Sequence, residues 1–384
     1  MYILLLAVIY LAFISLGLPD SLLGSAWPTL YAELGVPVSY MGIITMIISG
    51  GTIISSLLTD KVTAKFGTRR VTYVSTLLTA IALFGFSYST KFYQLCLLGI
   101  PYGLGAGAID ASLNNYVALH YNSKHMSWLH CFWGVGTIIS PYVMSYALTH
   151  SMWQNGYRTV SLIQVLIAIV IACSLPLWKV NRQKNQEEVD TKPIGLVGAI
   201  KIKGVPEIII AFMAYCACES TAMLWTSSYF ESAYQMSKEG AAALGSIFFI
   251  GMTFGRFMSG FFADKLGDFK MIKLGAAIAF AGIILTAVPI QSVAMAGFII
   301  TGLGCAPIYP CIIHTTPVRF GKEKSQSIIG VQMASAYFGA TFMPPLFGIL
   351  ANAISFKLMP AFTGGFMLLM FLMIRKTERD TVSL

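Results

Sequence analysis

The chain has 384 residues, of which 56% are hydrophobic and 11% are charged, and its formal net charge is +9. A water-soluble globular protein of this length needs far more polar surface than this composition supplies. The composition therefore excludes a water-soluble globule and indicates a protein that crosses a membrane several times.

Apolar stretches of about 20 residues, the length that crosses a bilayer core, predict twelve transmembrane helices. In the first half they are expected near residues 2–30, 38–58, 71–89, 93–118, 126–149 and 158–178. In the second half they are expected near residues 206–230, 241–263, 271–289, 292–316, 325–352 and 355–374. The first stretch lacks the basic start of a signal peptide and is longer than its apolar core, so we count it as a helix.

The basic residues predict the orientation. Twenty of the 25 lysines and arginines fall in loops that follow even-numbered helices, in the segment between the sixth and seventh helices, or near the C-terminus. Lysine and arginine near helix ends are retained on the cytoplasmic side. We therefore expect a multi-pass protein of the plasma membrane with both termini in the cytoplasm, and the net charge needs no nucleic-acid partner.

The longest polar stretch, KVNRQKNQEEVDTKPIGLVGAIKIKGVPE, separates the sixth predicted helix from the seventh. It mixes both signs of charge with proline and glycine, which is typical of a flexible or partly amphipathic linker. The chain is therefore expected to comprise an N-terminal six-helix bundle at 1–178, a cytoplasmic linker at 179–205, and a C-terminal six-helix bundle with a short tail at 206–384.

The two halves repeat each other. The segment GLGAGAID, which ends at Asp110, pairs with GLGCAPIY, which ends at Tyr309. PDSLLGSAW pairs with CESTAMLW and sets Asp20 opposite Glu219, at the same offset of 199 residues. Two parallel repeats of six helices, related by pseudo-twofold symmetry with a site at their interface near the midplane, are typical of transporters.

The segment GFFADKLGDFK resembles the GxxxDRxGRR signature that follows the second helix of a half in the major facilitator superfamily. It matches through Gly260, Asp264, Lys265 and Gly267. The resemblance implies the all-α fold of that superfamily, with twelve transmembrane helices in two bundles.

The first copy of the signature, SLLTDKVTAKFGTRR, departs from the pattern because Gly67 lies seven residues after Asp60 where three are expected. Arg69 and Arg70 still supply its basic end. A carboxylate at a helix end can be held by cations and amide dipoles and released again. We therefore predict conformational latches, with ordinary surface salt bridges as the alternative, at Asp60, Arg69, Arg70, Asp264 and Lys265.

Within the superfamily the chain resembles the fucose permease family of sugar:proton symporters. The resemblance rests on Asp20 in GLPDSLL, on Asp110 with Asn114 and Asn115 in GAIDASLNNYV, and on LHCFWGVGTIISP in the fifth helix. It implies that the two acids line a cavity, one binding sugar and the other handling the proton, without deciding which sugar is carried.

The residues indicate the same region without the resemblance. Asp20, Asp110, Glu219 and Arg256 are the acidic or basic side chains that fall deep within predicted helices. Such groups cost roughly 2.5 to 3.5 kcal/mol at the bilayer centre and therefore face a cavity or a partner. Removing a carboxylate from water without a cation favours its protonated form, so we predict proton coupling at Asp20, Asp110 and Glu219. Arg256 is the competing partner: an acid paired with it stays ionised and becomes structural or a solute-linked switch.

On an ideal helix, Gly103, Gly107, Asp110 and Asn114 fall on one stripe, where the glycines allow another helix to approach closely. Aromatic rings beside carboxylates and carboxamides suit a pyranose, whose CH faces stack and whose hydroxyls need hydrogen-bond partners. For Trp27, Trp133 and Trp225, lining the cavity competes evenly with a place in the aromatic belt. The predicted solute-binding residues are Asp20, Trp27, Asp110, Asn114, Asn115, His130, Trp133, Trp225, Tyr309 and Gln332.

The sequence contains no P-loop, nucleophile elbow or zinc-binding HExxH motif, and its seven cysteines show no metal-ligand spacing. We therefore predict no enzymatic activity, cofactor or metal. The expected function is a secondary active transporter, a monomer in its lipid bilayer, that moves a small polar solute, above all a monosaccharide, with protons by alternating access. A proton-coupled multidrug exporter, a sodium-coupled sugar symporter and a transporter-shaped sensor remain alternatives.

Overall fold

The computed structural model describes residues 2–174, 176–178, 193–237, 240–241 and 244–381, and the regular elements within these residues are all helices. In the first half they are α1 (Tyr2–Gly17), α2 (Leu22–Leu34), the 3-10 helix η1 (Val38–Tyr40), α3 (Met41–Phe66), α4 (Thr68–Phe86), α5 (Phe92–His120), α6 (Ser123–His150) and α7 (Trp153–Cys173). In the second half they are α9 (Gly195–Ile200), α10 (Val205–Tyr234), η2 (Leu244–Ser246), α12 (Ile247–Leu266), α13 (Asp268–Thr286), α14 (Gln291–Cys305), α15 (Ile308–Phe320), α16 (Ser325–Ala353), η3 (Phe356–Leu358) and α17 (Met359–Thr381).

The predicted all-α membrane class is confirmed. Eleven helical segments among the described residues are long and apolar enough to cross a membrane. The remaining long helix is α4, which has 19 residues and begins with Thr68, Arg69 and Arg70. Each of the twelve predicted stretches contains at least one described helix.

Two stretches that we predicted as single helices are broken. The first is interrupted at residues 18–21, between α1 and α2, and the tenth at residues 306–307, between α14 and α15. Pro19 and Pro307 lie in these interruptions. Proline has no amide hydrogen and clashes with the preceding helical turn, and a broken membrane helix is tolerated where it is enclosed by protein or lines a cavity.

The chain folds into two compact units. Unit 1 comprises Met1–Tyr116, Leu129–Gly195 and Lys322–Met333. Unit 2 comprises Val117–Trp128, Leu196–Gly321 and Ala334–Leu384. The helices α5, α6 and α16 therefore each contribute to both units. The division into bundles at 1–178 and 206–384 stays a prediction.

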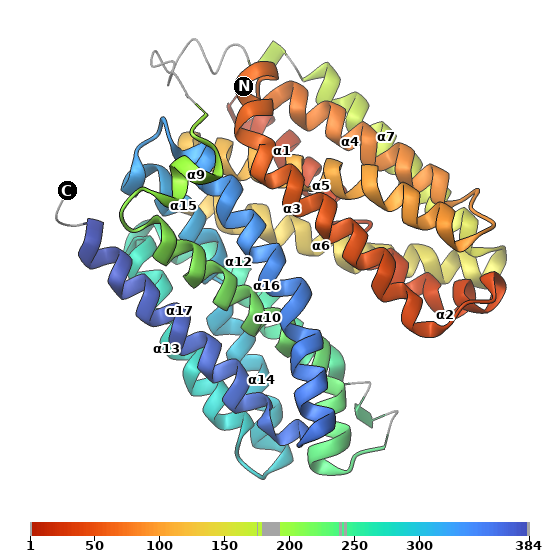
Figure 1. Cartoon of the computed structure of the whole chain (residues 1–384), viewed down its shortest axis with the longest axis vertical. Coiled ribbons are helices and arrows are strands. Elements are labelled where there is room, and N and C mark those ends of the chain that lie inside the picture. Colours follow the sequence, from red (N-terminus) through yellow and green to blue (C-terminus); the bar gives the residue numbers. More distant parts are fainter. Residues whose placement is uncertain (1, 175, 179–192, 238–239, 242–243, 382–384) are drawn as a thin grey trace. The chain divides into compact units, whose positions relative to one another are not determined.

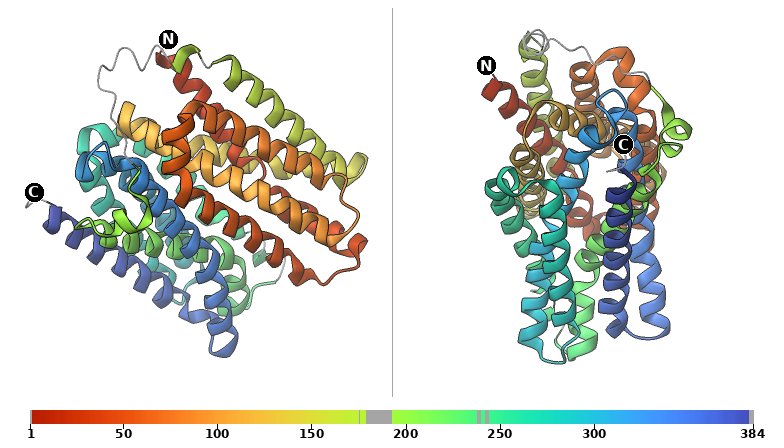
Figure 2. Two further views of the ribbon diagram at one scale, coloured as in Figure 1. Left: turned by 45° about the horizontal axis from the view of Figure 1, so that its top comes forward. Right: turned by 90° about the vertical axis from the view of Figure 1, so that its left-hand side faces the viewer.

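Within unit 1, α4 and α7 pack side by side, and within unit 2 α10 packs along α17 and α13 along α14 (Figures 1 and 2). The predicted close approach at the glycines of α5 is confirmed. A Cβ atom at Gly103 would overlap the carbonyl of Ile48 on α3, and one at Gly107 would overlap the carbonyl of Thr52. The glycine stripe therefore brings α5 against α3 and fixes how the polar residues of α5 are presented.

The linker contains a short helix, and the last helix is longer than predicted. Residues 179–192 of the predicted linker lie outside the described residues, and within its remainder α9 forms between Gly195 and Ile200. The last helix, predicted to end near residue 374, continues to Thr381 and includes Arg375, Lys376 and Arg379. Long basic side chains extend from an apolar helix surface toward water, so hydropathy underestimates the length of this helix.

Candidate functional site

Asp20 lies in the interruption between α1 and α2. Its amide donates to the carbonyl of Gly17 in a turn, and the amide of Leu22 donates to the carbonyl of Pro19. Gly17 lets the backbone of α6 approach, since a Cβ atom there would overlap the carbonyl of Trp133. The turn therefore presents the Asp20 side chain beside α6.

Two neutral donors hold the Asp20 carboxylate. The indole nitrogen of Trp133, on α6, donates to Oδ2 at 2.8 Å. The hydroxyl of Tyr102, on α5, donates to Oδ1 at 3.2 Å. Asp20 is exposed, whereas Tyr102 is buried and Trp133 is half-buried. The turn before α2, the helix α5 and the helix α6 therefore bring a carboxylate, a phenol hydroxyl and an indole together within unit 1.

Asp110 lies on α5 and is only 3% exposed. The amide nitrogen of Asn114, one turn further along, donates to its Oδ1 at 2.7 Å. The amide oxygen of Asn114 lies 3.1 Å from Nε2 of His130 on α6. Because an amide oxygen only accepts, Nε2 of this histidine carries a hydrogen. A hydrogen-bonded chain therefore runs from His130 through Asn114 to the buried carboxyl group.

Asp20 and Asp110 interact electrostatically with each other. Both belong to unit 1, and Tyr102, Asn114, His130 and Trp133 surround them from α5 and α6. The structure thus brings five of the ten predicted solute-binding residues into one polar cluster, and two of the five are also predicted proton groups. Like charges at short range oppose each other's ionisation, so the charge on one acid is felt at the other.

Two predicted solute-binding tryptophans pack in other ways. Trp27 is 4% exposed within the apolar core of unit 1, and its indole nitrogen donates to the carbonyl of Val38 at 2.8 Å. Trp225 donates to the carbonyl of Pro344 at 2.8 Å and packs against the ring of Phe347. Trp27 is therefore corrected to a packing residue of the core, whereas the assignment of Trp225, which is half-buried, stays a prediction.

Asn115 also differs from its prediction. Its amide nitrogen donates to Oε1 of Gln326 at 2.9 Å, and its amide oxygen accepts from Ser325 at 2.6 Å. Consecutive residues on a helix point about 100° apart, so Asn115 cannot share the face of Asn114. It binds the start of α16 instead of joining the Asp110 cluster. Gln332, further along α16, is fully buried.

The deep charges of unit 2 form an ion pair. Nη2 of Arg256 on α12 lies 3.1 Å from Oε1 of Glu219 on α10, and both side chains are buried. Glu219 thus has the cation partner that the sequence offered as the alternative to proton coupling. Tyr309, another predicted solute-binding residue, packs at an angle against the ring of Phe212, with ring centroids 4.6 Å apart.

Asp60 is held without the arginines that we expected. It is 3% exposed, and its Oδ2 accepts from the hydroxyl of Ser327 at 2.7 Å and from the amide of Gly195 at 3.0 Å. Arg69 and Arg70 are not among the partners of Asp60 in the described part of the chain. We name the contacts of Ser325, Gln326 and Ser327 with Asn115 and Asp60 the α16 tie.

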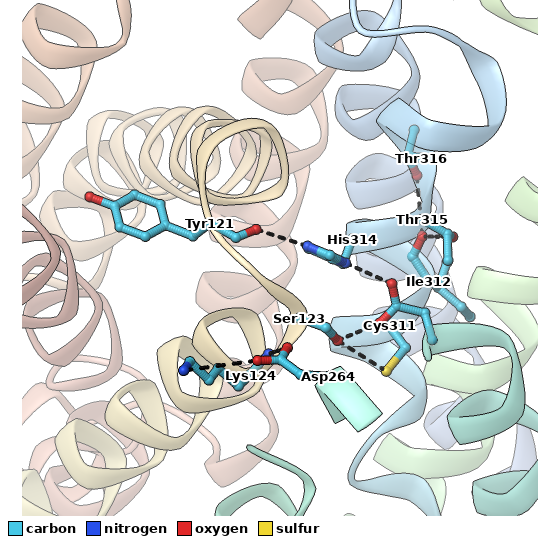
Figure 3. Close-up of polar contacts among 10 residues, drawn as sticks. Tyr121, Ser123, Lys124, Asp264, Cys311, Ile312, His314, Thr315 and Thr316 are labelled. Carbon is cyan, nitrogen blue, oxygen red and sulfur yellow. Dashed lines mark hydrogen bonds and ion pairs between the residues drawn. The ribbon is translucent and has the colours of Figure 1, made fainter. Parts of the chain in front are cut away.

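Asp264 occupies the matching place in unit 2. It accepts from the amide of Lys124, in the first turn of α6, at 3.1 Å, and lies 3.9 Å from its ammonium group (Figure 3). The N-terminal turn of a helix has unpaired amides and a partial positive charge, which favour this carboxylate. Lys265 is exposed. We name the contacts of Tyr121, Ser123 and Lys124 with α12, α13 and α15 the α6 tie.

The irregular spacing of the first signature has a structural explanation. Gly67 and Gly267 end α3 and α12 with nearly the same backbone angles, φ 77° and φ 79°. Four extra residues therefore separate Asp60 from its glycine, and four residues make about one helical turn. The extra turn keeps Asp60 on the same face but places it deeper than Asp264, whose side chain is 31% exposed.

The small residue of the signature also has a visible role. A Cβ atom at Gly260 would overlap the indole nitrogen of Trp128, on α6. In unit 1 the first signature has Ser56 at this place, and its partner on α16 is Gly330, where a Cβ atom would overlap the carbonyl of Ser56. One partner of each contact is a glycine, because the Trp128 ring lies too close to Gly260, and the Ser56 backbone too close to Gly330, to leave room for a second side chain.

Sequence reasoning missed three groups of contacts. Tyr102 could have been predicted as a site residue from the segment GIPYGLGAGAID, because it lies about two turns before Asp110 on the same helix. Ser327 and the pair of Asp268 and His314 gave no such signal, because their partners are distant in the sequence. Among the described residues no group of three or more His, Cys, Asp or Glu side chains is arranged to hold a metal ion.

The chain is similar to several membrane transport proteins. It is 21% identical to Bypass of stop codon protein 6 of Saccharomyces cerevisiae, over 91% of this chain and 77% of that protein. It is 24% identical to the cis,cis-muconate transport protein of Acinetobacter baylyi, over 70% and 67% of the two chains. It is 22% identical to the glucose/mannose transporter GlcP of Bacillus subtilis, over 88% and 86%.

Solved structures share the fold. The major facilitator transporter FucP in its outward conformation matches with a TM-score of 0.80 and 14% identity, over 98% of this chain and 99% of that chain. The proton:xylose symporter XylE matches with a TM-score of 0.82 and 13% identity, over 97% and 95%. The profile of the Major Facilitator Superfamily matches residues 9–331 and, in a second match, 208–383. The chain therefore belongs to the major facilitator superfamily of membrane transporters.

Proposed function

We propose that this transporter carries a small hydroxylated solute, a monosaccharide, together with a proton by alternating access. It acts in the plasma membrane with both termini in the cytoplasm, as its basic loops predict. The bundles at 1–178 and 206–384, joined by the linker at 179–205, are the parts that move in this proposal. The observation that carries it is the pairing of an accessible acid, Asp20, with a buried one, Asp110.

Asp20 is the solute-binding acid. Its carboxylate is exposed and is flanked by the indole of Trp133 and the hydroxyl of Tyr102. A pyranose stacks its CH-rich face on an aromatic ring, while its hydroxyl groups donate to a carboxylate. The two neutral donors hold the carboxylate in place and leave lone pairs on both oxygens for the solute.

Asp110 is the proton-carrying acid. It is buried, and it accepts a hydrogen bond from the neutral amide of Asn114, whose oxygen contacts His130. An ionised carboxylate in such a place is costly, and protonation removes the cost. Because Asp110 interacts electrostatically with Asp20, its protonation changes the charge that a solute meets, which couples the two events.

Glu219 has no part in this route. Its carboxylate lies 3.1 Å from the guanidinium of Arg256, so this buried cation already has an acidic partner. An anionic solute, such as the muconate named for one relative, would meet the acids Asp20 and Asp110. The buried Arg256 would not offset them, because Glu219 already pairs with it. A sugar is supported by the similarity to the glucose/mannose transporter GlcP, the proton:xylose symporter XylE and the E. coli fucose:proton symporter FucP.

The test is uptake into proteoliposomes across a panel of radiolabelled sugars, with an imposed pH gradient or an imposed sodium gradient. We expect a pH gradient to drive accumulation of at least one sugar. Asp110→Asn should retain exchange of that sugar at equal concentrations but lose accumulation, whereas Asp20→Asn should lose binding. Accumulation by Asp110→Asn against the sugar gradient would contradict the proton role, and accumulation driven by sodium alone would replace the proton by sodium.

A further inference from the structure

The first turn of α6 meets α13 and α15 in a cluster that the proposed function does not use (Figure 3). The hydroxyl of Ser123 donates to Oδ1 of Asp268, and Oδ2 of Asp268 lies 2.6 Å from Nδ1 of His314. Nε2 of His314 lies 2.9 Å from the carbonyl oxygen of Tyr121. The imidazole therefore bridges a carboxylate and a backbone carbonyl, and this bridge is part of the α6 tie.

The chemistry of these contacts requires a proton. The Tyr121 carbonyl only accepts hydrogen bonds, so Nε2 must carry a hydrogen. An ionised carboxylate also only accepts, so the contact between Nδ1 and Asp268 needs a hydrogen as well. A neutral imidazole has only one N–H. With a neutral imidazole and an ionised carboxylate, either tautomer leaves two acceptors facing each other at one end of the bridge.

We propose that Asp268 and His314 form a proton-binding site that holds the α6 tie together when occupied and loosens it when empty. The occupied site is an imidazolium beside a carboxylate, in which each ring nitrogen of His314 donates one hydrogen bond. When the proton leaves, the bridge between Tyr121 and Asp268 keeps only one of its two hydrogen bonds, which loosens the segment 117–128. This site lies on the side of the basic loops, is separate from Asp20 and Asp110, and does not depend on which solute is carried.

Charged and titratable groups on α6, α12 and α15 lie in the same region as the pair of Asp268 and His314. Asp264, at the end of α12, supplies a second carboxylate to the α6 tie, 3.9 Å from the ammonium group of Lys124 on α6. Cys311, one turn before His314 on α15, lies 3.9 Å from the Ser123 hydroxyl. His125 follows Lys124 and stacks edge-on against Trp128 at 5.8 Å.

The other half of the chain lacks a titratable group at the matching place. Asn115 and His314 are separated by the same 199 residues as Asp110 and Tyr309. Asn115 binds the start of α16 with an amide, which has no proton to gain or lose near neutral pH. The superfamily signature also has an arginine where this chain has Asp268, and an arginine could not pair with an imidazolium. The matched positions therefore differ in chemistry: the α6 tie has a histidine paired with a carboxylate, where the α16 tie has an amide.

The test is hydrogen exchange of the peptide 117–128 in the full chain in nanodiscs, corrected for intrinsic rates, at about pH 6 and about pH 9. We expect wild-type protection to fall by about tenfold or more between these values. Asp268→Asn should be protected at both pH values, because its amide donates to Nδ1 while Nε2–H still donates to Tyr121. His314→Asn should show no pH response.

His125→Gln is the matched control, a neighbouring histidine outside the bridge, and should keep the wild-type response. Asp110→Asn should also keep it, which separates this inference from the proposed coupling site. A flat wild-type profile, or an Asp268→Asn profile equal to wild type, overturns the proposal. Loss of the response in Asp110→Asn overturns it as well.

A spectroscopic measurement on the unaltered chain covers the case in which Asp268→Asn fails to fold. With ¹⁵N-labelled histidine, one of the five histidines, identified by its absence in His314→Asn, should show two protonated ring nitrogens near pH 6 and one near pH 9. If the spectrum shows one protonated ring nitrogen of His314 at both pH values, the histidine neither gains nor loses the proton in this range, and the proposal fails.

Discussion

Arg256 binds Glu219 across α10 and α12, with Nη2 and Oε1 3.1 Å apart and side-chain exposures of 6% and 10%. Two charges at this depth stabilise each other only as a pair, since each alone would keep the cost of leaving water. The pair therefore links α10 to α12 within unit 2, and each side chain supplies the partner that the other needs.

The ion pair gives the first prediction. Arg256→Gln or Glu219→Gln alone leaves one charge buried without its partner, which typically costs about 3–5 kcal/mol. The double variant Glu219→Gln with Arg256→Gln removes both charges and should recover most of that loss. Denaturant unfolding of the detergent-solubilised protein measures all three. If the double variant loses as much as the two single losses combined, the side chains are not acting as a pair.

Replacing Asp60 should destabilise the protein more than replacing Asp264, the matching acid of the second signature. Asp60 is buried and accepts hydrogen bonds from Ser327 and Gly195. Asp60→Ala leaves the buried Ser327 hydroxyl and the partly buried Gly195 amide without this acceptor and should cost about 1–3 kcal/mol. Asp264 is partly exposed and binds Lys124, so Asp264→Ala should cost about 1 kcal/mol or less. Unfolding measured in parallel on both variants decides this order, and an equal loss would contradict the assigned difference in depth.

The close contact of α5 with α3 predicts a steric effect. Gly103→Ala forces a methyl group onto the Ile48 carbonyl, and such overpacking typically costs about 1–3 kcal/mol. Gly50→Ala is the matched control, because a Cβ atom there meets nothing within 4 Å. Thermal stability in detergent should fall for Gly103→Ala and stay near wild type for Gly50→Ala. Equal behaviour of the two variants would mean that α5 does not touch α3 at Gly103.

The donors to Asp20 predict a specific effect on solute binding. Trp133→Phe keeps an aromatic ring but removes the N–H that donates to Asp20, and a hydrogen bond to a charged group contributes about 1.5–3 kcal/mol. We expect the KM for the transported sugar to rise about tenfold or more.

Trp27→Phe supplies the comparison, since its indole donates to the Val38 carbonyl in the core. It should lower stability and leave KM near the wild-type value. Uptake kinetics over a range of sugar concentrations separate the two effects. A rise in KM for Trp27→Phe equal to that for Trp133→Phe would remove the distinction between a site residue and a core residue.

Composition and repeats were enough to predict the fold of this protein. Hydropathy alone located the helices, because a segment in lipid must satisfy its own backbone hydrogen bonds and has few alternatives to a helix. The deep positions of Asp20, Asp110, Glu219 and Arg256 also followed from hydropathy, since a charge within an apolar stretch is visible without any knowledge of its neighbours.

Which side chains contact one another across helices could be learned only from the tertiary structure. Asp110 has its partner Asn114 one turn away, which helical spacing predicts, whereas Asp20 finds Tyr102 and Trp133 on two other helices. Whether Arg256 would bind Glu219 or point elsewhere was open for the same reason. Helical periodicity reports which residues share a face, but it contains no information about which other helix lies against that face.

The broken helices and the ties illustrate the same limit. Pro19 indicates that the first helix can be kinked. Only the packing against α6 shows that the break presents Asp20 to Trp133. Asn114 and Asn115 are adjacent in the sequence and identical in chemistry, yet one binds Asp110 and the other binds the start of α16. A rotation of about 100° between neighbours on a helix separates them, and what each one meets depends on contacts between segments more than 200 residues apart.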